Sequence, residues 1–492
     1  MTVPSPAPLG NDTPPAPTRL RVEGGFAGTA ACLTDMESAA RVLDGVGDDV
    51  RHVAARAVKC AAAVPPRSVL LSPATAARAE GRLASTVAGP TGLVARGLAI
   101  DGVADELRCA ARAYREAEAA ARSALEIAQR AMGLSSSALF IGVTLQRAGT
   151  GWVVANAPVP EPIDPWRDDL ADRLGTTPFA ALGKTLDEVP WATDLLVGGA
   201  RTALDLTGGV PLSYPHEVAT LLAGSAELGW FDDRRPVVAV PGATGRPVPP
   251  PTGVADLMRD QTALLRCHPA DGPACPQQGP GRVRIVRVRQ TDGSGAWVVE
   301  LPGTQQWDPV SGPNPVDLTA DLRLMGEQRT QLGRGVAAAL ADAMRGAGVA
   351  PGAEPVMLAG HSQGGILAAS LAASPAFARR FRVTHVVAAG APIARLPVPE
   401  RVRVLALEHR QDPVPRLDQL ADPDRRRWVT VHRDLGDVVD DALAAHDSRR
   451  YTRTGQLVDR SGAASLLDWR SHSSRFLRGT GAREWDYRLV RK

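Results

Sequence analysis

The residues with the clearest chemical potential form the pentapeptide Gly360-His361-Ser362-Gln363-Gly364. An apolar run, 355–359, precedes it, and a stretch of small residues, 365–369, follows it. This order predicts a strand, a sharp turn and a helix with Ser362 at the apex, the arrangement of a nucleophile elbow. A serine hydroxyl is a weak nucleophile alone, so it needs a histidine base, an acid to orient that base, and donors for an oxyanion. A tight turn with a structural serine is the alternative.

The acid that we predict is Asp412. The apolar runs 383–389 and 402–407 are typical of buried parallel strands, and the second leads into the loop 408–415. Asp412 therefore lies just past the carboxyl end of a strand, where open α/β sheets assemble their sites. Prolines at 413 and 415 stiffen the loop. Glu408 is the reserve acid, and an Asp-Pro turn without a catalytic role is the structural alternative.

The base that we predict is His446. This type of site orders its triad serine, acid, histidine along the chain. His446 follows a helix-like stretch, 438–445, and opens a polar segment, 446–451. His409 precedes the acid, and His432 follows the predicted strand 428–431. His472 is the next candidate, and a solvated surface histidine is the alternative for His446.

The oxyanion requires two backbone donors, one of them from Gln363, the residue after the serine. The other should come from an earlier strand-to-helix loop. The run 296–301 predicts a strand that leads into such a loop, where Gly303 lets the backbone approach an anionic oxygen closely. Thr304 is the preferred donor there, with Gln305 as the alternative.

Together these parts resemble an α/β-hydrolase of the lipase and esterase type. The resemblance is carried by Pro-Gly-Thr at 302–304, the elbow, Gly-Ala-Pro at 390–392, Asp-Pro-Val-Pro at 412–415, and His446 with a tyrosine a few residues later. The same parts recur in class 3 lipases and, more loosely, in cutinase-like and PE-PPE hydrolases of actinobacteria. The match covers residues 280 to 455 and implies a mostly parallel, doubly wound sheet and a serine esterase that needs no cofactor. Class 3 lipases usually carry Arg-Gly-Thr where this chain has Pro-Gly-Thr.

Residues 23–135 predict an α-helical hairpin or bundle, with breaks at 65–66 and 89–92. The segment 105–118 resembles the second helix of WXG100-type and related type VII secretion substrates. Tyr114 and Glu118 match their Tyr-x-x-x-Asp/Glu export signal, although no Trp-x-Gly turn is present. The resemblance implies a secreted or cell-envelope protein, or a helical partner for this region. Without export, the protein would be cytoplasmic.

Three further regions complete the predicted organisation. Residues 1–22, rich in proline and without an apolar core, predict a disordered tail. Residues 136–279 predict a helical and linker region that either forms a lid over the active site or joins the domains. Residues 280–492 predict the α/β domain with a C-terminal helical extension.

Composition excludes several classes of function. A net charge of +3 over 492 residues, with short arginine clusters and no interleaved aromatic residues, argues against a nucleic-acid-binding protein. No apolar run approaches the roughly 18 residues of a transmembrane helix. No metal-binding or phosphate-binding motif is present. Of the five cysteines, Cys267 and Cys275 could close a short disulfide, whereas those at 32, 60 and 109 predict buried apolar positions.

The sequence thus predicts an ester-cleaving serine hydrolase with a small-molecule or lipid substrate. The alternative is a hydrolase-fold scaffold without turnover, whose N-terminal helices mediate type VII secretion or bind a partner.

Overall fold

The structure, a computed structural model, describes residues 20–62, 65–117, 119–120, 231–264, 281–306, 310–418, 420–436 and 442–492. The chain divides into two compact units, Thr29–Ala128 on the one hand and Met1–Gly28 with Gln129–Lys492 on the other. Some predictions fall outside the described residues: the tail up to residue 19, most of the middle region, the Cys267–Cys275 bridge and Glu118.

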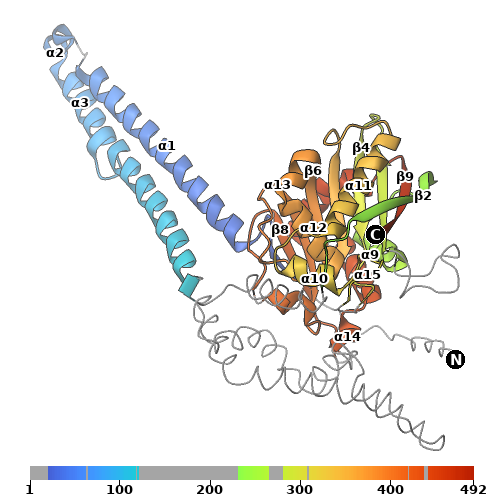
Figure 1. The fold of residues 1–492 in the computed structure, drawn as a ribbon. Helices are drawn as coiled ribbons and strands as arrows, with labels where there is room; N and C mark the ends of the chain where they lie inside the picture. Colours follow the sequence, from blue (N-terminus) through green and yellow to red (C-terminus); the bar gives the residue numbers. More distant parts are fainter. Residues whose placement is uncertain are drawn as a thin grey trace, which may run out of the picture. The chain divides into compact units, whose positions relative to one another are not determined.

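The first unit is a helical hairpin, as predicted. Its helices are α1 (Thr29–Ala62), α2 (Pro66–Leu71), α3 (Pro73–Ala88) and a helix over residues 93–117. Figure 1 shows α1 and α3 as long neighbouring helices. Ion pairs between α1 and the helix 93–117 fix an antiparallel register, namely Glu37–Arg115, Asp44–Arg108 and Arg51–Asp101. Small side chains such as Ala40, Ala104 and Ala111 are fully buried.

Because small side chains dominate its buried positions, this hairpin leaves much apolar surface exposed. The prediction that the cysteines at 32, 60 and 109 are buried is wrong, since all three are exposed. The stretch Pro73–Ala117 also contains a window with a mean hydropathy of 1.2, long and apolar enough to cross a membrane by length and composition alone. A helix of a soluble protein passes the same test, so this finding assigns no membrane segment.

The second unit is built on a nine-stranded mixed sheet with the order β1-β8-β7-β6-β5-β4-β3-β9-β2. Strands β4 to β8 are parallel to one another, and the remaining pairings are antiparallel. The five predicted strands are confirmed as β4 (Gly295–Leu301), β5 (Pro355–His361), β6 (Arg382–Ala389), β7 (Arg403–His409) and β8 (Trp428–Arg433). A helical region followed by an α/β sheet is therefore the architecture.

Helices cover both faces of this sheet. One apolar layer contains α10 (Leu318–Met325), α11 (Gln331–Gly346), α12 (Gln363–Ala373) and α13 (Pro375–Arg380), packed against residues such as Val299 and Leu358. The other contains α9 (Val254–Leu264), α15 (Ser448–Arg460) and α16 (Ala464–Leu477), packed against Val298 and Met357. Neighbouring residues of β4 and β5 thus face opposite layers, because side chains alternate along a strand. Figure 1 shows the strands between these helices.

Three predicted boundaries are wrong, because strands lie where tail, linker or helix was expected. Residues 20–22 belong to β1 (Leu20–Gly24), which pairs with β8. The region 136–279 includes β2 (Val237–Val248) and α9, both part of the second unit. The C-terminal extension begins with helices α15 and α16 but ends in β9 (Gly481–Arg491), between β3 (Gly281–Arg289) and β2 in the sheet.

Candidate active site

Ser362 lies at a strained turn between β5 and α12. Its φ of 54° and ψ of −125° are unusual for a residue with a side chain, and such backbone strain costs on the order of 1–3 kcal/mol. The turn is tight: a Cβ on Gly360 would lie 2.0 Å from the carbonyl carbon of Gly364, and one on Gly364 would lie 2.2 Å from the oxygen of Leu301. Only glycine fits at either position, as the elbow pattern predicted.

The structure brings His446 and Asp412 together. The Nδ1 of His446 lies 2.8 Å from the Oδ2 of Asp412, and the carboxylate is 1% exposed. Burial alone would raise the pKa of Asp412. The neighbouring imidazole, together with hydrogen bonds from His446, Tyr451 and the amide of Val414, outweighs it and lowers that pKa. Asp412 is therefore an ionised carboxylate that can orient the imidazole through Nδ1, leaving Nε2 to accept a proton.

A tyrosine that sequence reasoning left without a role completes the surroundings of the acid. The hydroxyl of Tyr451 donates to the Oδ2 of Asp412 at 2.6 Å, and its ring stacks on His409 at a centroid distance of 3.8 Å. The side chain is fully buried, and burial, with Asp412 beside it, raises its pKa well above the ordinary value. Tyr451 is thus a permanent hydrogen-bond donor to the acid. Its position five residues after His446 was the only signal in the sequence.

His361, predicted only as part of the elbow, also contacts the base. Its Nε2 lies 2.9 Å from the backbone oxygen of His446, and the two rings are 4.7 Å apart between centroids. Burial, with His446 next to it, lowers the pKa of His361 to about 3. The ring is therefore neutral near pH 7 and donates from Nε2 to that carbonyl, which fixes the segment that carries the base.

Two glycines let the separate loops converge on Ser362. A Cβ on Gly303 would lie 3.3 Å from the Cβ of Ser362, so the predicted oxyanion loop passes directly beside this serine. The amide of Ser362 donates to the carbonyl of Ala389 at 2.8 Å. A Cβ on the next residue, Gly390, would lie 3.1 Å from both the Oδ2 of Asp412 and the Cε1 of His446. Ser362, His446 and Asp412 therefore lie together at the carboxyl ends of the parallel strands.

Two aspartates outside the predicted set anchor the predicted oxyanion donors. The hydroxyl of Thr304 donates to Oδ2 of Asp321 at 2.7 Å, and the amide nitrogen of the Gln363 side chain donates to the backbone oxygen of Asp317 at 2.6 Å. Burial, with Asp317 nearby, raises the pKa of Asp321 to about 7. Both residues predicted to supply oxyanion donors, Gln363 and Thr304, are thus fixed by a direct hydrogen bond from their side chains.

The alternative site residues lie elsewhere. Glu408 pairs with His432 at 3.3 Å, and His432 also contacts Glu23 of β1. His409 bonds the backbone oxygen of Ala445 at 2.7 Å, and His472 bonds that of Asp468 on the same helix. The structure does not bring these groups to Ser362 as an alternative acid and base.

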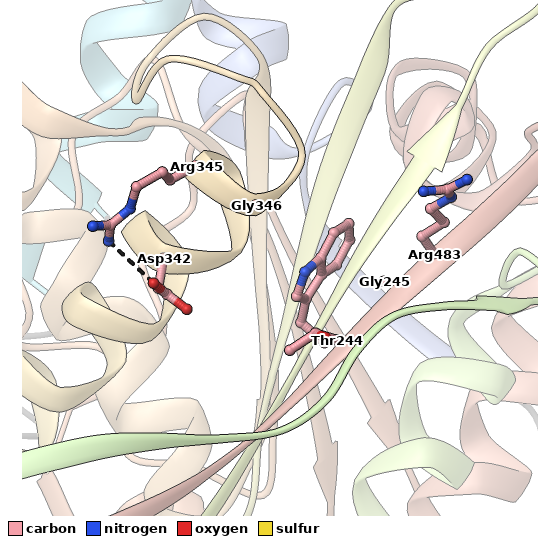
Figure 2. Close-up of a pocket in the computed structure, with 7 residues that line it drawn as sticks. Thr244, Gly245, Asp342, Arg345, Gly346 and Arg483 are labelled. Atoms are coloured by element: carbon pink, nitrogen blue, oxygen red, sulfur yellow. Dashed lines mark ion pairs between the residues drawn. The ribbon is translucent and has the colours of Figure 1, made fainter.

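A surface recess lined by residues of β2, β9 and α11 lies away from Ser362, His446 and Asp412. Figure 2 shows Asp342 and Arg345 of α11 on one side and Arg483 of β9 on the other. It lies near the start of β9, whereas the candidate site lies where the parallel strands end. Among the described residues, no group of three or more histidine, cysteine, aspartate or glutamate side chains is arranged to hold a metal ion.

Comparison of the chain with protein-family models, with curated proteins and with solved structures finds no match.

Proposed function

We propose that this protein is a serine hydrolase of the α/β-hydrolase fold that cleaves carboxylic esters. The observation that carries the proposal is the strained turn at Ser362 beside a hydrogen-bonded His446–Asp412 pair whose carboxylate is buried. Strain at a non-glycine residue persists only where the surrounding structure enforces it, and it concentrates at functional sites. A half-buried serine at the end of a parallel strand, next to a histidine whose tautomer a carboxylate fixes, supports acyl transfer.

In the proposed reaction, the hydroxyl oxygen of Ser362 attacks the ester carbonyl carbon while His446 accepts the hydroxyl proton at Nε2. Asp412 stabilises the imidazolium that forms. The amides of Gln363 and Thr304 donate to the oxyanion of the tetrahedral intermediate. The protonated His446 then donates to the leaving alcohol, and water, activated by the same histidine, releases the acid from the acyl-enzyme. The substrate is a small-molecule or lipid ester, and the reaction as proposed uses no cofactor.

The test is hydrolysis of p-nitrophenyl esters over a series of acyl chain lengths, together with labelling by a fluorophosphonate probe. We expect the full chain to hydrolyse at least one ester and to take up one probe molecule on Ser362. The Ser362→Ala variant should lose both properties while it keeps its melting temperature. Ester hydrolysis and labelling that persist in Ser362→Ala would refute the proposal.

We propose a second function for the hairpin, binding of a helical partner or of a secretion machinery. It is favoured by the apolar side chains that the hairpin leaves in solvent: Val42 is 67% exposed, Leu98 is 64% exposed, and Tyr114 is 63% exposed. Buried apolar side chains, not exposed ones, normally stabilise a helix pair, so surface of this kind is typical of interaction sites. Export is tested by detecting the protein in culture medium, where Tyr114→Ala should reduce its amount; equal amounts would exclude an export signal at Tyr114.

A further inference from the structure

A short segment before α10 connects the two halves of the proposed oxyanion hole. On one side, the amides of Gln305 and Gln306 donate to the carbonyl of Val316 at 2.9 and 3.2 Å, and the amide of Leu318 donates to Gln306 at 2.8 Å. The side chain of Asn314 adds a hydrogen bond to that of Gln305 at 2.8 Å. The residues that directly follow Gly303 and Thr304 are therefore held by the segment 312–318, which we call the bracing segment.

The bracing segment also holds the other half of the hole. The side chain of Gln363, 1% exposed, donates to the backbone oxygen of Asp317 at 2.6 Å. The carboxylate of Asp317 accepts from the amide of Ala320 and so caps α10. The relative position of the two predicted oxyanion donors, Thr304 and Gln363, thus depends on where the bracing segment lies.

The position of the bracing segment is set by Arg491, the last residue of β9. Its amide donates to Pro313 at 2.7 Å, and its guanidinium donates to the carbonyl of Gly312 at 3.0 Å. The same guanidinium pairs with Asp317 at 2.5 Å and with Asp233 at 3.2 Å. The Arg491 side chain is completely buried, and both carboxylates are almost completely buried. The fixed fork of a guanidinium can satisfy a carboxylate and carbonyls together, which a lysine ammonium cannot do in the same geometry.

We propose that Arg491 is a positioning residue for the oxyanion hole. Through Asp317 and the bracing segment it fixes the separation between the amides of Thr304 and Gln363, without touching the substrate. The inference rests on the proposed hydrolase function. It assigns a role in the reaction to a buried ion pair that would otherwise be counted as fold stabilisation alone. A buried ion pair often stabilises a fold no more than apolar side chains of the same volume would. Stability alone therefore does not explain the Arg491 pair, and positioning is a second role for it.

The test compares four full-length proteins: the wild type, Arg491→Lys, the double variant Arg491→Met with Asp317→Asn, and the control Arg488→Met. The double variant avoids leaving an unpaired buried charge at Asp317, which would strongly destabilise the chain. Arg488 lies on the same strand but is exposed. Thermal melting defines a temperature at which all four are folded, and kinetics are measured there on the best p-nitrophenyl ester.

We expect kcat to fall about 10- to 100-fold in both Arg491 variants, because a displacement of the order of 1 Å in an active site has that effect. KM should change little. The affinity for a trifluoromethyl ketone, whose adduct places an oxyanion in the hole, should fall by the same factor as kcat/KM. The pH profile of Arg491→Lys should keep its shape, because His446, Asp412 and the Asp317–Asp321 pair are unchanged in that variant. A purely structural role for Arg491 would not produce this combination.

The inference is wrong if the folded Arg491 variants match Arg488→Met in kcat and in affinity for the ketone. It is also wrong if the loss appears in KM, or if the pH profile of Arg491→Lys moves. If the wild type neither hydrolyses esters nor reacts with a fluorophosphonate, the proposed function fails, and the role of Arg491 fails with it. An active wild type with unaffected Arg491 variants refutes the positioning role alone.

Discussion

Asp412 shows how single side chains set the chemistry of the site. A fully buried carboxylate would normally take up a proton, yet hydrogen bonds from His446, Tyr451 and the amide of Val414 keep its charged form favourable. Hydrogen bonds to a charged group contribute about 1.5–3 kcal/mol each. Tyr451 therefore supports the ionised form of Asp412, much as Asp412 supports the orientation of His446.

Tyr451→Phe removes one of these donors and should lower kcat on the order of tenfold, because the remaining bonds hold the carboxylate less firmly. Steady-state ester hydrolysis measures the change. Tyr487→Phe is a matched control: its hydroxyl donates to Asp342 at 2.9 Å, near the recess in Figure 2. That variant should keep the wild-type kcat. Equal activities of the two variants would show that the bond to Asp412 has no catalytic effect.

Asp321 should make the reaction rate depend on pH near neutrality. Burial raises its pKa to about 7, and its carboxylate accepts from the hydroxyl of Thr304. Protonation below that pH removes the charged acceptor and loosens the anchor of the oxyanion loop. We therefore expect the rate of ester hydrolysis to fall as the pH drops through about 7. The Asp321→Asn variant should not show this fall.

Asp418→Asn provides the control for this pH experiment. Burial raises the pKa of Asp418 to about 6, but its carboxylate accepts from the amide of Ala394 and makes no contact with the oxyanion loop. Its profile should superimpose on that of the wild type. A step near pH 7 that survives in Asp321→Asn would assign it to another group.

At the scale of the elements, the site depends on turns where the strands end. Gly390, after β6, has a φ of +59°, which favours glycine, and faces Tyr451, Asp412 and His446. Gly390→Ala would place a methyl group 3.0–3.1 Å from all three side chains. We expect at least a tenfold fall in kcat, because the acid and the base must move to make room.

Gly348→Ala is the matched control for Gly390→Ala. Gly348 has a φ of +69°, but a Cβ there would meet nothing within 4 Å. Both substitutions should destabilise the protein by about 1–2 kcal/mol through backbone strain, as measured by urea unfolding. Only Gly390→Ala should lose activity. If both variants lose activity to the same extent, strain and not contact with the triad is responsible.

The elements that the sequence predicted correctly are those with a local signal. Continuous apolar runs predicted β4 to β8. The order of elbow, acid and base along the chain selected Ser362, Asp412 and His446, which the structure brings to the same end of the parallel strands. Strands β1, β2, β3 and β9 were missed. Proline and glycine within β2 and regular polar residues within β9 are typical of loops or exposed segments, and the pairing of β1, β2 and β9 is long-range. The alternation of arginine and apolar residues in β3 is a local strand signal that went unused.

The supporting residues of the site could not be predicted for the same reason. Tyr451 is an aromatic residue in a polar segment, and only the fold brings it to an acid 39 positions away. Arg491 is 174 positions from Asp317, in a chain with many arginines. Which of them is buried depends on the three-dimensional contacts of β9. The residues proposed to perform the chemistry were therefore easier to predict from the sequence than the residues that hold them.

The molecule as a whole carries several buried titratable groups with opposing effects on stability. Burial lowers the pKa of His361, His385 and His409 to about 3, 3 and 4. Each takes up a proton on unfolding below its ordinary pKa near 6.5, so the free energy of unfolding that it contributes falls as the pH falls. The carboxyls of Asp321 and Asp418 have raised pKa values and act in the opposite direction. The overall pH dependence is a sum of both.

His385→Leu isolates one of these contributions away from the candidate site. His385 lies on β6, packed edge-on against Phe476, and burial, with Arg403 and His472 nearby, keeps it neutral. Between pH 6.5 and pH 4 the wild type should lose about 1.4 kcal/mol per pH unit relative to the variant. Urea unfolding at several pH values measures the gap. A gap that stays constant over this range would show that His385 is protonated in the folded protein.

Strand β1 has a consequence for how the chain is made. Glu23 on β1 contacts His432 on β8, 409 positions later. At a synthesis rate of roughly 5–20 residues per second, β1 leaves the ribosome about 20–80 seconds before β8 exists. Local helices form within about a microsecond, so the hairpin between them has ample time to fold first. Until β8 is synthesised, β1 has no strand to pair with. Its backbone hydrogen-bonding groups are then accessible to chaperones or to other nascent chains.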